Sequence, residues 1–346
     1  MPQHTPATLD WLLTPDDQNP GVRYFALRDL LNYPPDAPDC IAAQAEVMRT
    51  GPIPTILDAQ YPAGYWIKPG PGYSPKYRAT VWQVIFLAQL GGEGQANRDK
   101  RIRRAVDYVL DQHQTGEGLI SYNGKPTGAI HCLWGNLMRA ILDLEGPAYI
   151  PDERMKRAIE QLARSVTGDG YESYHRSGIQ GPGFRCAAND GLPCAWGAIR
   201  VLWALNRALP AWKAAGDDPA IIESAIETCV HFLLQYNVRE ANYPYRERIS
   251  SGWFKFGYPL GYVTDVLLNL EVLLRAGKAG DPRLQAAVDW VRSKQDSQGR
   301  WKMEYSYNGK MWCNVEAKGA PSKWVTLRAM RVLKMWETGS KTERQR

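Results

Sequence analysis

Three cysteines and one histidine form the most chemically suggestive group in the sequence. Cys132 and Cys194 each stand two residues before a tryptophan at the start of an apolar segment, and Cys186 lies eight residues before Cys194. His131 adjoins Cys132. Three thiolates and one imidazole complete a tetrahedral zinc site, and helix N-termini favour the thiolate form. We therefore expect Zn²⁺ here as a Lewis acid or water activator, with ordinary packing of buried cysteines as the alternative.

Candidate groups for proton transfer lie further along the chain. Asp265 falls inside a strongly apolar segment, where a carboxylate costs free energy unless it is paired or used. Burial favours the protonated form, so Asp265 is predicted to act as a general acid; an ion pair with an arginine or a helix N-terminus is the alternative. Tyr262 and His175 are further proton-transfer candidates, with an ordinary loop histidine as the other interpretation of His175. Asp190 joins them if the substrate is a sugar.

The aromatic residues are unusual in kind, with 13 Trp and 18 Tyr against 6 Phe. Their faces can stabilise a carbocation or stack on a sugar, and they also pack in ordinary cores. The residues predicted to line a substrate cavity are Trp134, Trp196, Trp253, Tyr258 and Trp324.

These residues sit on or beside helices that are predicted to be apolar on nearly all sides. Such segments span 80–90, 132–144, 194–209, 262–274 and 322–336, and residues 19–31 supply a sixth. A tryptophan is the third residue in four of them, which places Trp134, Trp196 and Trp324 in equivalent positions. Helices without a polar face are buried on more than one side.

A second class of helix alternates with the first. Each begins with a capping aspartate, at Asp99, Asp152, Asp218 or Asp281, and repeats apolar residues at helical spacing on one face. The alternation predicts two layers, with Thr8 to Leu13 docking beside the C-terminal helix as a sixth outer helix. We therefore predict an all-α fold, a closed (α/α)6 double-layer barrel whose rim loops are rich in Gly, Pro and aromatic residues. Residues 1–338 form a single domain, and 339–346 form a frayed, charged tail.

Composition narrows the possible functions. The 346 residues contain neither an apolar run of 18 or more nor an N-terminal signal pattern, which predicts a cytoplasmic protein without a transmembrane segment. The net charge of +6 comes from basic residues that are spread along helices rather than clustered, so no nucleic-acid partner is expected. Six cysteines are too few for a disulfide scaffold.

Two turns share the pattern Gln-x-x-x-Gly-x-Trp, at Gln60–Trp66 and Gln295–Trp301. This pattern is the turn signature of squalene cyclases, and the chain resembles the terpenoid-cyclase and protein-prenyltransferase superfamily of α/α toroids. The likeness is carried further by segments similar to bacterial proteins with prenyltransferase/squalene-oxidase repeats, namely 19–24, 132–136, 253–259 and 322–328. The chain lacks the Asp-x-Asp-Asp acid of class II cyclases. It also departs from the Asp-x-Cys zinc motif of prenyltransferases, since Asp190 and Cys194 are four residues apart.

The resemblance implies an enzyme that processes a small apolar or polycyclic, terpenoid-like molecule in an aromatic-lined central cavity, assisted by zinc. Two alternatives stay open. One is a polysaccharide or glycoside lyase or hydrolase, a carbohydrate-active reading drawn by analogy with other α/α barrels, with Asp190, His175 and Asp265 as acid/base groups. The other is a non-catalytic binding scaffold with a structural zinc. The sequence indicates neither the substrate nor the oligomeric state.

Overall fold

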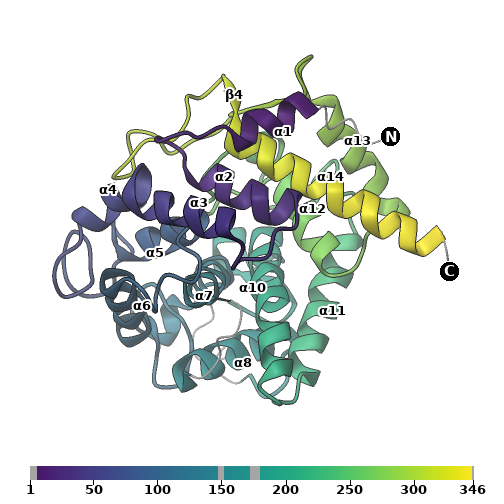
Figure 1. The fold of residues 1–346 in the computed structure, drawn as a ribbon. Helices are drawn as coiled ribbons and strands as arrows, with labels where there is room; N and C mark the ends of the chain where they lie inside the picture. Colours follow the sequence, from purple (N-terminus) through teal and green to yellow (C-terminus); the bar gives the residue numbers. More distant parts are fainter. Residues whose placement is uncertain (1–5, 147–151, 172–179, 345–346) are drawn as a thin grey trace.

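The chain folds almost entirely into α-helices, which confirms the predicted all-α class. The computed structural model describes residues 6–146, 152–171 and 180–344. Two kinds of helix alternate along most of this length, as the hydrophobic pattern predicts. Helices that are apolar all round lie inside, and helices with one polar face lie against them on the outside (Figure 1).

The inner helices are buried along most of their described length. They are α2 (Gly21–Phe25), continued by the π-helical turn η1 (Ala26–Leu30), α5 (Thr80–Gln89), α7 (His131–Glu145), α10 (Ala195–Ala214), α12 (Val266–Arg275) and α14 (Lys323–Arg344). Every residue of α5 is buried, and so is every residue of α12 before Arg275. The predicted helix over 262–274 begins only at Val266, because the Asp265 carboxylate caps it by accepting the Leu268 N–H at 2.7 Å.

The outer helices bury a single face. They are α1 (Pro6–Leu13), α3 (Pro38–Arg49), α4 (Pro52–Asp58), α6 (Lys100–His113), α8 (Glu153–Thr167), α11 (Ala220–Leu234) and α13 (Gln285–Ser293). Three of the four predicted aspartate caps are confirmed; at α11 the capping position is taken by Pro219, and Asp218 accepts the Ala220 N–H at 3.0 Å from one residue earlier. Asp99 and Asp152 each accept the backbone N–H two residues later at 2.8 Å, and Asp281 does so at 3.0 Å in the 3₁₀ turn η6 (Pro282–Leu284), which leads into α13.

The inner helices contact one another in the order of the sequence. α7 packs between α5 and α10, α10 packs on α12, α12 packs on α14, and α14 packs on α2 and η1. At the remaining junction the start of α2 meets the end of α5: a Cβ on Gly21 would lie 2.3 Å from Leu90 O, so the close approach requires glycine. α1 packs against α14 from the other end of the chain, as predicted (Figure 1).

The two Gln-x-x-x-Gly-x-Trp turns play the same structural part. Trp66 and Trp301 are fully buried. The indole N–H of Trp66 donates to Ile56 O at 2.8 Å, and that of Trp301 donates to Val291 O at 2.7 Å, in each case ten residues back in the preceding outer helix. Each turn therefore links the C-terminal part of an outer helix to the segment that leads to the next inner helix.

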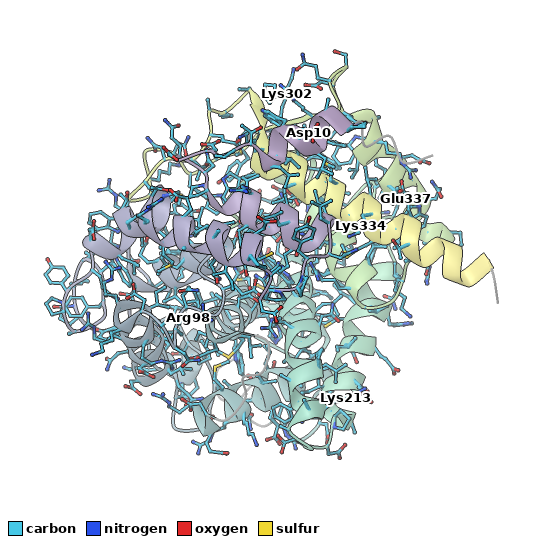
Figure 2. All side chains as sticks on the ribbon, viewed as in Figure 1. Asp10, Arg98, Lys213, Lys302, Lys334 and Glu337 are labelled. Carbon is cyan, nitrogen blue, oxygen red and sulfur yellow. The ribbon has the colours of Figure 1, made fainter. Side chains whose placement is uncertain are left out.

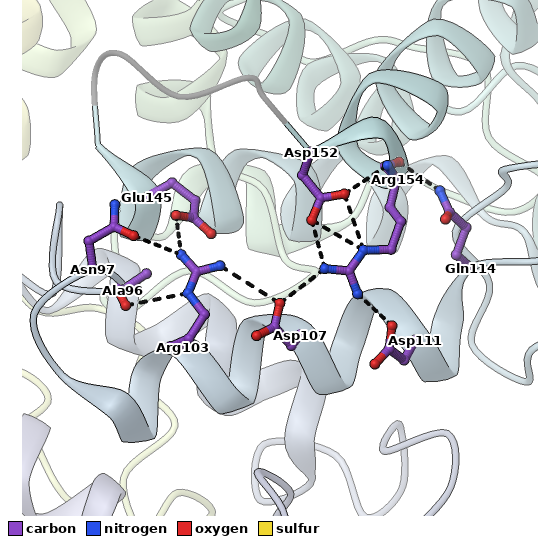
Figure 3. A network of polar contacts seen from close by, with 9 residues as sticks. All are labelled: Ala96, Asn97, Arg103, Asp107, Asp111, Gln114, Glu145, Asp152 and Arg154. Atoms are coloured by element: carbon purple, nitrogen blue, oxygen red, sulfur yellow. Dashed lines mark hydrogen bonds and ion pairs between the residues drawn. The ribbon is translucent and has the colours of Figure 1, made fainter.

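A polar network joins three neighbouring helices at the surface (Figure 3). Arg103 on α6 forms an ion pair with Glu145 at the end of α7, and it lies 3.7 Å from Asp107. Arg154 at the start of α8 reaches Asp107 at 3.0 Å and Asp111 at 2.5 Å, both on α6. These pairs hold the outer helices α6 and α8 in register with each other.

The described residues also form two short antiparallel pairs of strands that the hydrophobic pattern does not predict. β1 (Gln180–Gly181) pairs with β2 (Arg185–Cys186), and β3 (Trp301–Lys302) pairs with β4 (Pro321–Ser322). The first pair belongs to the loop before α10 and places Cys186. The second joins a Gln-x-x-x-Gly-x-Trp turn to the start of α14.

Charged side chains occupy the outside of the molecule (Figure 2). The labelled residues Asp10, Arg98, Lys213 and Lys302 project from widely separated elements rather than from one face. Among the residues that the structure describes, none of the helices combines the length and apolar character needed to cross a bilayer. α14 continues to Arg344, beyond the boundary predicted at residue 338.

Candidate active site

The three cysteines predicted as zinc ligands gather at the N-terminal ends of α7 and α10. Cys132 lies in the first turn of α7, and Cys194 immediately precedes α10. Cys186 ends strand β2, and the Cys194 N–H donates to Phe184 O at 2.8 Å beside it. The Cys194 thiol donates a hydrogen bond to the Cys186 sulfur, and Cys132 is close enough to both for electrostatic interaction.

The surroundings of the three thiols make them chemically different. The hydrogen bond from Cys194 lowers the pKa of Cys186 to about 6, helped by the N–H groups of Ala188 and Asn189 in the 3₁₀ turn η4 (Ala187–Asn189). Burial raises the pKa of Cys132 to about 12, and the pKa of Cys194 rises because Cys194 keeps its proton in the hydrogen bond to Cys186 and is buried. Cys186 is therefore the thiol of the group that ionises most readily and its candidate nucleophile.

His131 does not join the cysteines through its Nε2 atom. That atom lies 2.8 Å from Ser165 Oγ on α8, and the Ser165 hydroxyl donates to Leu162 O, so Nε2 carries the proton and donates. The histidine is buried, which lowers its pKa to about 3. Its Nε2 therefore holds α7 against α8, and the role of His131 as a zinc ligand stays a prediction.

The described part of the chain contains no group of three or more His, Cys, Asp or Glu side chains arranged to hold a metal ion. The three cysteines are near one another, but the thiols of Cys132 and Cys194 favour their protonated forms, which bind metal poorly. Zinc therefore stays a prediction that these residues do not support in this conformation.

An apolar pocket of about 130 Å³ opens beside the reactive thiol. Its wall includes Cys186, Cys194 and the rings of Trp196 and Trp253, which are 6.2 Å apart. Tyr243 packs on Trp253 at 5.3 Å and completes the aromatic side. The sequence analysis predicted both tryptophans as lining residues. It missed Tyr243, Tyr245 and Ile249, which come from the loop after α11, where no helical period marks them.

The other aromatic residues predicted to bind substrate are buried, and Tyr258 also lines a small cavity of about 40 Å³ beside Arg331. Trp134 and Trp324 are both about 1% exposed. Tyr258 stacks on Trp324 with ring centroids 4.3 Å apart and donates its hydroxyl to Gln89 O, while the Trp324 indole donates to Asn19 Oδ1 at 2.9 Å. Their equivalent positions in the repeat reflect a packing role rather than a shared cavity wall.

Asp265 is committed to the fold, as the alternative interpretation predicts. Its two oxygens each accept a hydrogen bond from Arg328 at 2.8 Å, and the pair is only 2–3% exposed. One oxygen also caps α12. The general-acid role is therefore wrong, because both oxygens are occupied. Tyr262 is half-buried with its ring 5.0 Å from Trp82, and burial raises its pKa, so its phenol is protonated at neutral pH.

Two acid/base groups of the carbohydrate-active alternative, Asp190 and Asp265, occupy different surroundings. Asp190 has a left-handed backbone (φ 53°) in the loop after Cys186, and its exposed carboxylate lies 4.0 Å from Arg246. Asp265 is buried against Arg328 instead of facing the apolar pocket. His175 lies outside the described residues.

Arg200 is a polar residue that the sequence analysis overlooked. It is fully buried, one turn after Trp196 on α10, and burial lowers its pKa to about 10. One terminal nitrogen donates to Gly261 O at 2.6 Å and Val263 O at 3.2 Å, and its other two nitrogens have no hydrogen-bond partner among the described residues. The sequence contained a signal for this residue, namely an arginine within an otherwise apolar helical segment.

No family model and no curated protein matches the chain. Among solved structures, the chain is similar to a type II terpene cyclase from Scytonema, determined in complex with its substrate geranylgeranyl dihydroxybenzoate. The likeness covers 87% of this chain and 97% of that one, at 13% sequence identity and a TM-score of 0.31. A similarity this distant carries no inference about the reaction.

Proposed function

We propose that the protein is an enzyme in which the Cys186 thiolate attacks a small, largely apolar molecule held against Trp196 and Trp253. The observation that carries the proposal is the coincidence of the two features: the thiol with the lowered pKa forms part of the wall of an aromatic pocket. A thiolate in apolar surroundings is costly unless it is stabilised, and here the Cys194 thiol stabilises it.

The size of the pocket limits the part of the substrate that enters. An apolar protein cavity of about 150 Å³ holds one benzene molecule. The volume of about 130 Å³ therefore suits a single ring or a branched five-carbon unit, with the remainder of a larger molecule outside. The mostly apolar wall favours a terpenoid-like molecule over a carbohydrate, because buried sugar hydroxyls would lack partners.

The chemistry follows from the nucleophile. The sulfur of Cys186 would form a bond to an electrophilic carbon, such as a carbonyl or an alkene activated by a carbonyl group, while the π electron pair moves to the oxygen. The protonated thiol of Cys194 lies beside the reacting sulfur and is a candidate proton donor to that oxygen. This step needs no metal. Elemental analysis of the purified protein tests the zinc hypothesis independently of the thiol chemistry.

We infer that the six inner helices close into a ring with the cysteines at one mouth. Support comes from the unbroken order of contacts from α5 through α14 to α2 and from the approach of Gly21 to Leu90. In such a ring the N-terminal ends of neighbouring inner helices meet at the same mouth, which explains how residues 62 positions apart, Cys132 and Cys194, become neighbours.

Thiol labelling by paired reagents tests the proposal. N-phenylmaleimide should label Cys186 at least tenfold faster than a charged maleimide of similar intrinsic reactivity, because the phenyl ring fits the pocket. The labelling rate should level off at a lower pH than for an ordinary thiol, because a thiol of lowered pKa is ionised at a lower pH. Peptide mass spectrometry locates the label.

Three variants sharpen this experiment. Cys186→Ser should abolish fast labelling, and Trp253→Ala should remove the preference for the phenyl reagent. Cys194→Ala should move the inflection to higher pH by removing the hydrogen-bond donor. Trp290→Ala, at a partly buried tryptophan of α13 away from the pocket wall, is the control. Fast labelling that survives in Cys186→Ser, or equal rates with both reagents, would contradict the proposal.

A further inference from the structure

A second cavity, of about 510 Å³, is lined by arginines rather than by aromatic rings. Four inner elements supply them: Arg28 from η1, Arg139 from α7, Arg207 from α10 and Arg275 at the end of α12. A small extension of about 40 Å³ continues inward to Arg331 on α14. The cavity therefore lies where inner elements from distant parts of the sequence converge, and neither Cys186 nor Trp196 lines it.

Carboxylates hold these guanidinium groups in place. Asp143 pairs with Arg139 at 2.7 Å and with Arg207 at 3.0 Å. Asp29 pairs with Arg28 and Arg331, both at 2.5 Å. Each of these two carboxylates thus serves two arginines, and ion-paired guanidiniums are fixed in orientation before any ligand arrives.

The remaining pairs leave an excess of positive charge. Glu271 pairs with Arg275 at 3.0 Å and lies 3.5 Å from Arg331, and Glu93 pairs with Arg28. In total, five guanidiniums (Arg28, Arg139, Arg207, Arg275 and Arg331) share four carboxylates (Asp29, Glu93, Asp143 and Glu271). Within the described residues, the cluster is therefore one positive charge in excess.

Arg139 contributes most of the excess positive charge. In the described part of the chain its carboxylate partner is Asp143, which it shares with Arg207. Its guanidinium lies over the ring of Trp203 at 4.2 Å, with about a fifth of the side chain exposed. Burial lowers the pKa of Arg139, as expected for a cation with too little compensating charge.

Two helix C-termini meet here; Lys334, which is outside the cluster, serves one of them, and Arg207, which belongs to the cluster, serves the other. Lys334 donates to Asp29 O and Leu30 O at the end of η1, each at 2.9 Å. Arg207 donates to Leu142 O near the end of α7 at 2.9 Å. The partial negative charge of these ends is thus already matched.

We infer that this cavity binds a small molecule through a phosphate group carrying two or more negative charges. Guanidinium groups bind phosphate oxygens by paired, parallel hydrogen bonds, and arginine is favoured where such recognition is needed. The volume lies within the usual range of about 300–1,000 Å³ for small-molecule sites. The Trp203 ring fixes the plane of Arg139, so the ligand does not have to order it.

Calorimetry with inorganic pyrophosphate on the full-length protein, at low ionic strength, is the first test. Pyrophosphate should bind saturably and raise the melting temperature, whereas sodium chloride of equal ionic strength should do neither. Arg139→Gln should weaken binding at least tenfold. Arg164→Gln, which breaks an exposed ion pair with Glu160 on α8, should leave binding unchanged. Orthophosphate and citrate distinguish a phosphate site from a general polyanion site.

Asp143→Asn keeps the inference testable if Arg139→Gln does not fold. Removing this carboxylate frees both Arg139 and Arg207, so pyrophosphate should bind more tightly even if the protein melts at a lower temperature. Unchanged or weaker binding in Asp143→Asn, or equal stabilisation by chloride, would overturn the inference. Cys186→Ser should bind pyrophosphate normally, so the outcome is independent of the proposed thiol chemistry.

Discussion

Two buried arginines on inner helices show opposite solutions to the burial of a charge. Arg328 on α14 makes two hydrogen bonds to Asp265, both at 2.8 Å, and a third to Gly257 O. Arg200 on α10 has only backbone carbonyls of residues 261 and 263 as acceptors. A buried charge is tolerated when a paired charge and hydrogen bonds replace its hydration. The sequence placed Asp265 correctly in an apolar environment, but the identity of its partner depends on tertiary contacts 63 residues away.

Asp265→Asn isolates the ion pair from the capping role. Asparagine caps helices about as well as aspartate, so α12 keeps its N-terminal hydrogen bond while Arg328 loses its counter-charge. Leaving a buried charge uncompensated typically costs about 3–5 kcal/mol of unfolding free energy. Urea denaturation measures the loss, and Arg164→Ala at the exposed pair with Glu160 should cost no more than about 1 kcal/mol. A loss below about 1 kcal/mol in Asp265→Asn would mean that water replaces the carboxylate.

At the scale of helices and turns, local rules predicted most of what is observed. The aspartate caps and the apolar or amphipathic character of each helix depend on neighbouring residues, so the sequence contains them. The wall of the apolar pocket does not follow a local rule. Tyr243 and Ile249 reach Cys186 from a loop after α11, and β1 and β2 exist because backbone groups around residues 181 and 185 pair with each other. No period in the sequence encodes these contacts.

The equivalence of the two Gln-x-x-x-Gly-x-Trp turns predicts equal effects of equivalent substitutions. Trp66→Phe and Trp301→Phe each remove an indole N–H and leave the buried carbonyl of Ile56 or Val291 without its donor. Such a loss costs about 1–3 kcal/mol, and the two values should agree within about 1 kcal/mol. Trp290→Phe is the comparison, because Trp290 is a partly buried tryptophan of α13 that belongs to neither turn. Thermal and urea unfolding give the values; a large effect at one turn alone would show that the repeat is not structurally equivalent.

At the scale of the whole molecule, the sequence predicted two layers of helices and the gathering of the cysteines at one end. The sequence could not predict the second cavity, which is lined by arginines. The arginines around that cavity belong to four separate helical elements and look in the sequence like ordinary surface charges. Only the convergence of these elements turns scattered basic residues into one group.

The burial of two histidines predicts how acid affects the entire fold. His113 donates from Nδ1 to Ser121 O at 2.8 Å and accepts at Nε2 from the Gly72 N–H at 3.3 Å, and burial lowers the pKa values of both His113 and His131. The unfolded chain therefore binds protons as the pH falls through about 6.5 while the native state does not, so stability declines on acidification.

His131 should remove about 1 kcal/mol of unfolding free energy between pH 6 and pH 5, and His113 should add to the loss in the same direction. For His131 the decline should continue until the pH approaches the native pKa of about 3. Urea unfolding of His131→Gln across this range measures the effect. The slope of unfolding free energy against pH should fall by the contribution of one histidine, because glutamine takes up no proton in either state. His231→Gln, on the exposed side of α11, should keep the wild-type slope. An unchanged slope in His131→Gln would show that His131 is protonated in the native protein, with the second proton on Nδ1 and Nε2 still donating to Ser165.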